Sequence, residues 1–481
     1  MNLDKKLIKV GFAAIMVYAL YIFFGPTHVT LPLADYTKEE ALTEVTNELV
    51  KVNLPIIREA DLYYTDVIAY SSIGRYMEAN AMSEEEVAAL EEEVTLYSYE
   101  VATPYLSYQY DLKNKQLTKA ENIYLELEGE EFVHQYFGEA YSLVDEVDAS
   151  SFFDLWTVKQ TYEAPTSINT VTNVVDLYLE GHAIIGFEKY GLASSFPEAE
   201  ESLMQMLAGI FILLFLLGLL LFVTIHLIIK VVKKEIEAFW EPLALTIVAA
   251  IAWLFVNKAM GINLFSVGTI ESFMMIYLTF ATLLIRWQKD SRPLATRVAS
   301  LQPAVVHALF LMVIAQLLAE GFFYLASFFD TWVSPVSMHN VLIELNIWYI
   351  PIFTLFIGLC AAITEEAIFR HYMVPLFGRL GVVTALLATS FLWGIMHIGY
   401  DMYPWYIYVL EFIVISGPFF FFVYKKYGFA TAIFMHYFYN AFVTVLFVLS
   451  IDIKVAIVSF LVMLSPFLLL LVKEKEAWQE T

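Results

Sequence analysis

Cysteine is nearly absent from this 481-residue sequence, which contains Cys360 alone. A single cysteine excludes an intramolecular disulfide and a metal site built from several cysteines. Charged side chains are also scarce: they make up 16% of the residues, against about 25% in an average soluble domain. Apolar residues account for 59%. This balance indicates a chain that crosses a lipid bilayer rather than one with a large soluble core.

Basic residues are particularly scarce in one segment. Residues 25–202 hold 34 of the 51 acidic side chains but only 9 of the 27 basic ones. The net charge of −24 therefore belongs to this segment, and the rest of the chain is close to neutral. Because an acidic surface repels nucleic acid, we expect no nucleic-acid partner. A solvated acidic face explains the composition, and binding of cations or basic peptides is the alternative.

Ten apolar runs approach or exceed the length of about 20 residues that a membrane-spanning helix needs. They are Leu7–Phe24, Leu203–Ile229, Pro242–Val256, Leu264–Ile285, Ala304–Phe328, Ile347–Phe369, Leu380–His397, Trp405–Tyr424, Phe429–Leu449 and Val455–Val472. The third run is short, and we expect it to extend in both directions. A cleaved signal peptide is the alternative for the first run. Residues 25–28 lack a small-x-small cleavage site, so we expect an uncleaved anchor.

The distribution of lysine and arginine between loops predicts the orientation. With the N-terminus inside, every cytoplasmic segment carries basic residues, whereas the outer loops after the acidic segment hold only Lys258 and Lys454. Basic residues collect on the cytoplasmic side of membrane proteins. The sequence therefore predicts a multi-pass protein of the cell membrane with a cytoplasmic N-terminus and the acidic segment outside.

The acidic segment contains no apolar run long enough to span a bilayer. Two stretches predict helices and two predict strands: Thr37–Val52, Ser83–Ala102, Val171–Leu179 and Ala183–Phe187. Ser83, with Glu86 three residues later, predicts a capping box. The expected fold is thus an all-α polytopic transmembrane bundle of about ten spans with an inserted acidic α+β extracytoplasmic domain.

Ionisable side chains are costly inside a bilayer, so those within predicted spans are candidates for a functional site. The sixth span ends in Glu365 and Glu366, with Arg370 close behind. Glu366 and Arg370 are four residues apart, share a helix face and can pair. Glu365 points about 100° away and needs a partner from another helix. Such a carboxylate can serve as a general base.

Two later spans carry matching polar groups. The seventh contains Trp393 and His397, and the ninth contains His436 and Asn440 on one helix face. A glutamate and a histidine can deprotonate one water, while a histidine and an amide can donate to an oxyanion. Alternatively, two histidines and a glutamate can hold zinc with an open fourth position. A lone buried histidine is usually a core residue. Four polar side chains on nearby spans, two of them histidines, favour a functional site instead.

The pattern Glu-Glu-x-x-x-Arg at 365–370, aromatic-x-x-x-His at 393–397 and His-x-x-x-Asn at 436–440 resembles the CPBP (Abi) family of intramembrane proteases. This family includes the type II CAAX prenyl endopeptidases. The resemblance extends over roughly residues 347–449. In one respect the chain departs from the family: Trp393 stands where the family has phenylalanine. An aromatic side chain is retained, so we expect the change to be tolerated.

The resemblance implies roles for these residues: Glu365 and His397 activate the water, His436 and Asn440 form the oxyanion hole, and Glu366 and Arg370 support the site. The family has been described both as metalloproteases and as metal-independent glutamic peptidases. Asn440 suits an oxyanion donor better than a zinc ligand. We therefore expect no cofactor, with zinc as the alternative. Glu271, Glu320 and Glu411 also lie in predicted spans, where we expect structural hydrogen bonds, although Glu411 could line the same cavity.

We accordingly predict an intramembrane endopeptidase that acts in the lipid bilayer on a membrane-associated protein or peptide. An ion-coupled transporter or a non-catalytic immunity or scaffold protein is the alternative. The sequence shows no inverted repeat of the kind many transporters have. The expected divisions are an N-terminal anchor (1–24), the acidic extracytoplasmic domain (25–202), further transmembrane helices (203–346), CPBP-like catalytic helices (347–472) and a cytoplasmic tail (473–481).

Overall fold

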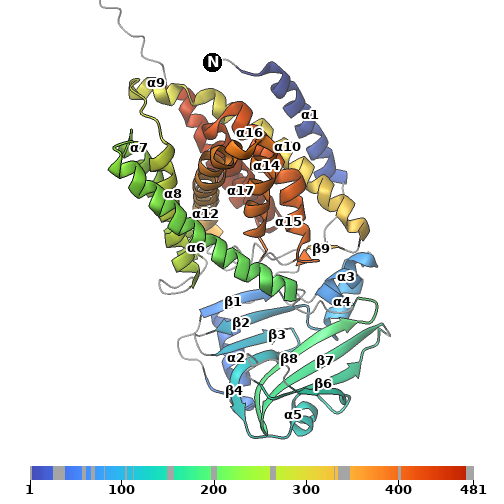
Figure 1. The fold of residues 1–481 in the computed structure, drawn as a ribbon. Coiled ribbons are helices and arrows are strands. Elements are labelled where there is room, and N and C mark those ends of the chain that lie inside the picture. Colours follow the sequence, from blue (N-terminus) through green and yellow to red (C-terminus); the bar gives the residue numbers. More distant parts are fainter. Residues whose placement is uncertain are drawn as a thin grey trace, which may run out of the picture.

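The protein consists of a helical bundle joined to a strand-rich domain at one of its ends (Figure 1). The computed structural model describes residues 3–24, 38–56, 61–66, 71–80, 82–102, 106–111, 113–148, 156–168, 170–196, 203–259, 267–329, 331–333, 347–398 and 402–472. The elements, contacts and exposed fractions given for the protein are those of these residues. The bundle and the sheet each have an apolar core of their own.

The strand-rich domain is built on one antiparallel sheet of eight strands in the order β1-β2-β3-β4-β8-β7-β6-β5. The strands are β1 (Asp61–Asp66), β2 (Tyr97–Ala102), β3 (Ser107–Asp111), β4 (Gln116–Leu125), β5 (Ser142–Asp148), β6 (Val158–Pro165), β7 (Val171–Glu180) and β8 (Ala183–Ala193). Four helices accompany the sheet: α2 (Lys38–Lys51), α3 (Ser71–Ala79), α4 (Glu84–Glu91) and α5 (Gly129–Tyr136). The mixture of helices and strands agrees with the α+β prediction.

The predicted local elements of this domain are confirmed with one exception. α2 lies over the first predicted helix, and β7 and β8 form a hairpin at the two predicted strands. The capping box is present, because Glu86 N donates to Ser83 Oγ and Ser83 N donates to Glu86 Oε2. The helix predicted to continue to Ala102 is wrong in its second half. It ends at Glu91, and the alternating aromatic sequence Tyr97–Ala102 pairs as β2, which suits a pleated surface better than a helix.

The bundle comprises α1 (Lys5–Phe24), α6 (Leu203–Val232), α7 (Trp240–Ala259), α8 (Val267–Arg286), α9 (Leu294–Ala299), α10 (Gln302–Ala326), α12 (Ile350–Glu365), α13 (Val374–Phe377), α14 (Val382–Ile395), α15 (Ile407–Glu411), α16 (Gly417–Tyr427), α17 (Phe429–Ile451) and α18 (Ile453–Met463). Two π-helices interrupt them, η4 (Glu366–Met373) and η6 (Phe412–Ser416). The 3-10 helices are η2 (Ser327–Phe329), η3 (Ile347–Tyr349), η5 (Gly378–Leu380) and η7 (Ser465–Leu471).

Among the described residues, six helices are long and apolar enough to cross a membrane, and a bent pair, α18 with η7, brings the number to seven if it forms one span. Two shorter apolar helical stretches cover Ser272–Arg286 and Val382–Ile395. A helix lies in each of the ten predicted runs, and α7 extends the short run in both directions as expected. The chain is thus a multi-pass membrane protein, while the count of ten spans stays a prediction.

The first helix packs into the bundle along α10. Its buried side chains Leu7, Ala14 and Tyr18 belong to the main apolar core. At its start, Asp4 accepts hydrogen bonds from the hydroxyl of Tyr427 at 3.0 Å and from the backbone of the first turn. Those hydrogen bonds hold the pKa of the Asp4 carboxyl below its usual value. α1 therefore packs as part of the bundle, and its role as an uncleaved anchor stays a prediction.

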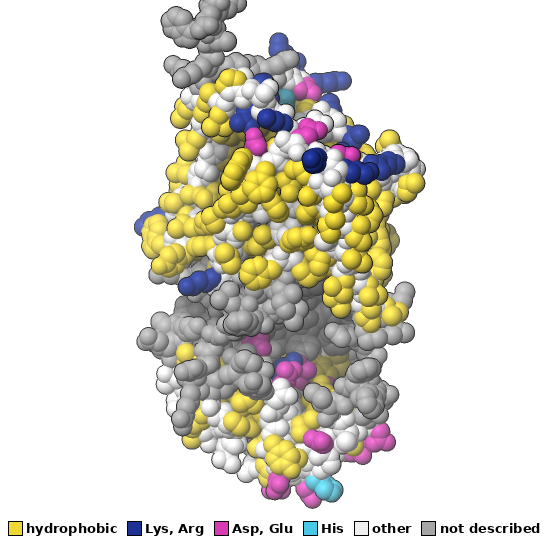
Figure 2. Space-filling model, turned by 60° about the vertical axis from the view of Figure 1, so that its left-hand side comes forward, with side chains coloured by type: hydrophobic (Ala, Val, Ile, Leu, Met, Phe, Trp, Pro, Cys, Tyr) yellow, Lys and Arg dark blue, Asp and Glu magenta, His cyan; other side chains and the backbone are white. Residues whose placement is uncertain are grey.

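Charge is distributed unevenly over the surface. Figure 2 shows a broad apolar band across one face of the bundle, and most Lys and Arg side chains on this face gather at the end farthest from the sheet. Acidic side chains mark the strand-rich domain at the other end. This pattern is the one that the orientation prediction requires, and the orientation itself stays a prediction.

The strand-rich domain meets the bundle through α3. A two-stranded ribbon, β9 (Trp332–Val333) with β10 (Met402–Tyr403), lies at this junction. The guanidinium of Arg75 on α3 stacks 3.8 Å from the ring centre of Tyr403. The two parts therefore touch at the loop that follows α14.

Candidate functional site

The polar residues predicted on three separate spans lie on α12, α14 and α17, which Figure 1 shows together within the bundle. A close approach sets the spacing of α12 and α17. A Cβ atom at Gly358 on α12 would lie 2.7 Å from Tyr437 Cδ2 and 2.9 Å from the Tyr437 carbonyl oxygen, so only glycine fits without a shift. Small residues let helices pack this closely in membranes.

The two adjacent glutamates occupy a change in helix type. Glu365 is the last residue of α12, and Glu366 opens the π-helix η4. π-helical turns are frequent at functional sites. Glu366 Oε1 lies 3.3 Å from an Arg370 terminal nitrogen, and both side chains are almost fully buried, at 0% and 2% exposure. The pairing expected from their spacing is therefore present.

α17 brings His436 between the two carboxylates. Its Nδ1 lies 3.0 Å from Glu366 Oε1, and its Nε2 lies 3.9 Å from Glu365 Oε2. A carboxylate can only accept, so the Glu366 contact places a proton on Nδ1. Nε2 then faces Glu365. The family resemblance implies a supporting role for Glu366, and its contact with His436 is one that only packing between helices can create.

α14 supplies Trp393 and, in the turn after its end, His397. The indole nitrogen of Trp393 donates a hydrogen bond to Glu365 Oε2. The His397 Nδ1 atom lies 2.9 Å from the Trp393 carbonyl oxygen, which again places the proton on Nδ1. The Nε2 atom of a neutral His397 is then an acceptor. Trp393 links His397 to the other groups of the site, since it also contacts Glu365 and the ring of His436.

Aromatic rings surround these groups. The Trp393 ring lies 5.8 Å from the rings of both His397 and His436, and the His397 ring lies 4.3 Å from that of Phe412. The Arg370 guanidinium stacks over Trp393 at 3.7 Å. Sequence reasoning missed these aromatic partners of the site, although it singled out Trp393 as a departure from the family.

Asn440 lies one helical turn beyond His436 on α17 and is half-buried. Its backbone carbonyl accepts from Thr444 at 3.1 Å. Within the part of the chain that the structure describes, no hydrogen bond or ion pair joins its side chain to Glu365, His397 or His436. The structure thus brings Glu365, Glu366, Arg370, His397 and His436 into one network, with Asn440 beside it on the helix of His436.

The other intramembrane glutamates take hydrogen bonds. Glu411 is buried and accepts from the Ser416 hydroxyl at 2.7 Å, across the π-helix η6. Glu320 accepts from Gln316 at 2.9 Å. The side chain of Glu271 lies outside the described residues. Glu411 and Glu320 thus fit the structural interpretation given to them.

The described residues contain no group of three His, Cys, Asp or Glu side chains arranged to hold a metal ion. The indole N–H of Trp393 engages Oε2 of Glu365, Nδ1 of His436 engages Glu366, and Nδ1 of His397 faces the Trp393 carbonyl oxygen. A metal-binding histidine makes the same kind of contact through its second ring nitrogen, so the histidine contacts fit a zinc site as well as a hydrogen-bonded carboxylate site. We derive no step through zinc, and metal dependence stays open to test.

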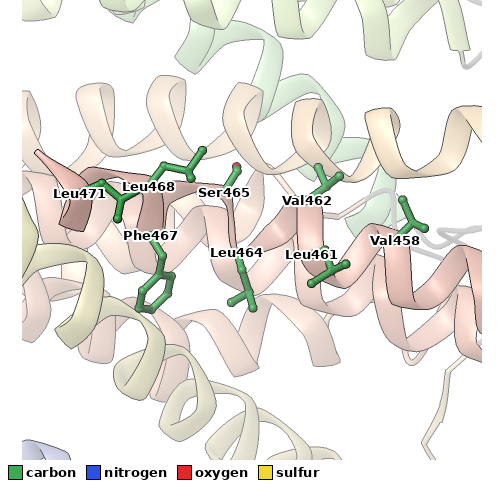
Figure 3. Close-up of a pocket in the computed structure, with 8 residues that line it drawn as sticks. All are labelled: Val458, Leu461, Val462, Leu464, Ser465, Phe467, Leu468 and Leu471. Atoms are coloured by element: carbon green, nitrogen blue, oxygen red, sulfur yellow. The ribbon is translucent and has the colours of Figure 1, made fainter.

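A separate depression lies at the C-terminal end of the bundle (Figure 3). Its lining is apolar apart from Ser465 and comes from α18 and η7: Val458, Leu461, Val462, Leu464, Ser465, Phe467, Leu468 and Leu471. None of the candidate site residues contributes to it. Its exposed leucines suit contact with lipid.

Comparison with known proteins identifies the segment that carries the network. Residues 347–442 match the family model described as type II CAAX prenyl endopeptidase Rce1-like. The match includes Glu365, Glu366, Arg370, Trp393, His397, His436 and Asn440. No curated protein and no solved structure gives a significant match.

Proposed function

We propose that the chain is a membrane protease of CAAX type, and that it hydrolyses its substrate with residues of the segment that matches the Rce1-like family model, 347–442. The substrate in this proposal is a membrane-associated protein or peptide. One observation carries the proposal. Glu365 lies 3.9 Å from His436 and accepts a hydrogen bond from Trp393, whose carbonyl oxygen lies 2.9 Å from Nδ1 of His397.

Glu365 and His397 are the proposed pair that holds and activates the water. Both present acceptors: the carboxylate of Glu365, and Nε2 of a His397 whose Nδ1 proton is directed to the Trp393 carbonyl. A water that donates to both is oriented for attack, and Glu365 takes its proton. The Glu365 side chain is 15% exposed, so it is the more accessible of the two adjacent glutamates.

His436 and Asn440 are the proposed donors to the oxyanion. Nε2 of His436 can donate when the ring carries both protons. The carboxylates of Glu366, at 3.0 Å, and Glu365, at 3.9 Å, flank the ring. The amide of Asn440, one turn away, supplies a second donor to the negative charge that develops in the transition state.

The test compares purified wild-type protein with E365Q and H397A on a quenched fluorescent peptide library in detergent, and measures metal content on the same samples. We expect cleavage by the wild type and none by folded E365Q. Full cleavage by E365Q would overturn the proposal. Stoichiometric zinc in the wild type that is lost in H397A would replace the glutamate mechanism with a metal-assisted one.

A transporter would behave differently in this comparison. It would cleave no peptide and would move protons across proteoliposomes in a manner abolished by E365Q. A scaffold protein would do neither.

A further inference from the structure

Trp393 lies at the centre of the candidate site rather than at its edge. Its indole nitrogen donates to Glu365 Oε2, and its carbonyl oxygen lies 2.9 Å from His397 Nδ1. Its ring lies 5.8 Å from the ring of His436. One residue therefore contacts all three ionisable groups of the proposed reaction.

The surroundings fix the plane of the indole ring. The Arg370 guanidinium covers one part of it at 3.7 Å, an arrangement in which a cation is attracted to the π-face. Phe412 and Phe420 pack on it at centroid distances of 4.3 and 5.0 Å. Trp393 is 3% exposed. Because the ring is held on several sides, the direction of its N–H bond is held as well.

We propose that the Trp393 indole N–H is a positioning donor that holds the Glu365 carboxylate in the orientation needed to accept the proton of the water. This inference rests on the proposed function and names a residue that the function does not require. The hydrogen bond engages Oε2, and no described residue engages Oε1 through a hydrogen bond, so Oε1 can face the water. Phenylalanine, which the resembling family carries at this position, fills the same space but cannot donate.

The first arm of the test detects the hydrogen bond without reference to activity. Full-length protein labelled with ¹⁵N-tryptophan in detergent gives indole N–H resonances from nine tryptophans. The resonance that disappears in W393F belongs to Trp393. We expect it downfield of the exposed Trp240 and shifted upfield in E365A, which removes the acceptor. A Trp393 resonance that E365A leaves in place would overturn the proposal.

The second arm measures how the hydrogen bond between Trp393 and Glu365 affects catalysis, using a peptide that the wild type cleaves. W393F keeps an aromatic ring beneath Arg370 but removes the donor. We expect kcat/KM to fall about 10- to 100-fold, as for loss of a hydrogen bond to a charged group. We also expect the acidic limb of its pH profile to move relative to that of the wild type, because this limb reports the group that accepts the proton of the water.

The control is W240F, which makes the same substitution at a tryptophan that is 74% exposed on α7. It should match the wild type. If W393F lowers kcat/KM by one factor at every pH, Trp393 only supports packing and the proposal fails. If E365Q retains cleavage, the proposed function fails instead, and the indole resonance alone then decides whether the hydrogen bond exists.

Discussion

Glu366 is the residue on which the buried polar network depends most. Its Oε1 atom contacts both Arg370, at 3.3 Å, and His436, at 3.0 Å, with no exposed surface of its own. Removal of one partner from a buried ion pair costs about 3–5 kcal/mol, because the other charge stays desolvated. We expect E366Q to lower the free energy of unfolding by about that amount. Denaturant titration in one detergent measures it.

Glu411 provides the matched control for this substitution. It is equally buried, but its partner is the hydroxyl of Ser416 and not a charge. E411Q keeps the size and can still accept this hydrogen bond, so we expect a loss below about 1.5 kcal/mol. Equal stability of E366Q and E411Q would show that Arg370 does not depend on Glu366.

Substitutions of Asn440 test whether its side-chain amide donates to the oxyanion. Its side chain contributes no described hydrogen bond to the fold, so removing it should affect the reaction more than stability. We expect N440A to lower kcat about 10²- to 10³-fold, as for loss of an oxyanion donor, with KM nearly unchanged. N440D, which keeps the size but exchanges the donor for an acceptor, should be equally slow.

The control for Asn440 lies on the same helix. T444V removes the hydroxyl that donates to the Asn440 carbonyl and leaves the amide in place, so its kcat should stay near that of the wild type. Wild-type kcat in N440D, measured on the same peptide, would remove Asn440 from the mechanism.

At the scale of elements, the pairing within one helix was predictable and the helix type was not. The spacing of Glu366 and Arg370 predicts contact on any helix, and that contact is present. The π-helix η4 leaves no mark on apolar periodicity, because every residue of the turn is buried except the half-buried His371. The turn packs against α8, α14 and α17, and no local sequence pattern specifies such contacts between helices.

Gly358 tests that packing directly. A methyl group there would lie 2.7 Å from a Tyr437 ring atom and 2.9 Å from the carbonyl of the same residue. We expect G358A to push α12 from α17, lengthen the Glu366–His436 contact, and lower both the unfolding temperature and kcat/KM, the latter at least about tenfold. Thermal unfolding and peptide cleavage on one preparation measure both.

Gly321 on α10 offers the same substitution in open space, since a Cβ atom there meets nothing within 4 Å. Alanine favours a helix over glycine by about 1 kcal/mol. G321A should therefore be as stable as the wild type or slightly more so, and fully active. A G358A protein that behaves like G321A would mean that the helices adjust without cost.

At the scale of the whole molecule, sequence patterns separated the two parts but did not connect them. Apolar runs and charge located the bundle and the acidic segment, and composition indicated β7 and β8. The remaining strands escaped detection; β5, at one edge of the sheet, is exposed along its whole length and carries no buried alternation. The contacts of Glu365 with Trp393 and His436 cross between helices, which no spacing within one helix can specify.

The predicted orientation can be tested by labelling cysteines introduced on either side of the membrane. Cys360 is fully buried, so the native protein is a silent background for thiol labelling. Glu139 in the strand-rich domain has a side chain that is 90% exposed, and Lys289 is exposed in the loop after α8. The distribution of basic loops places residue 139 outside the cell and residue 289 inside.

A membrane-impermeant maleimide should then label E139C on intact cells, and K289C only after permeabilisation. The opposite labelling pattern would invert the predicted topology. The Arg75–Tyr403 junction and the nearby turn that carries His397 would then lie on the cytoplasmic side. Only a cytoplasmic substrate could approach the site from that end.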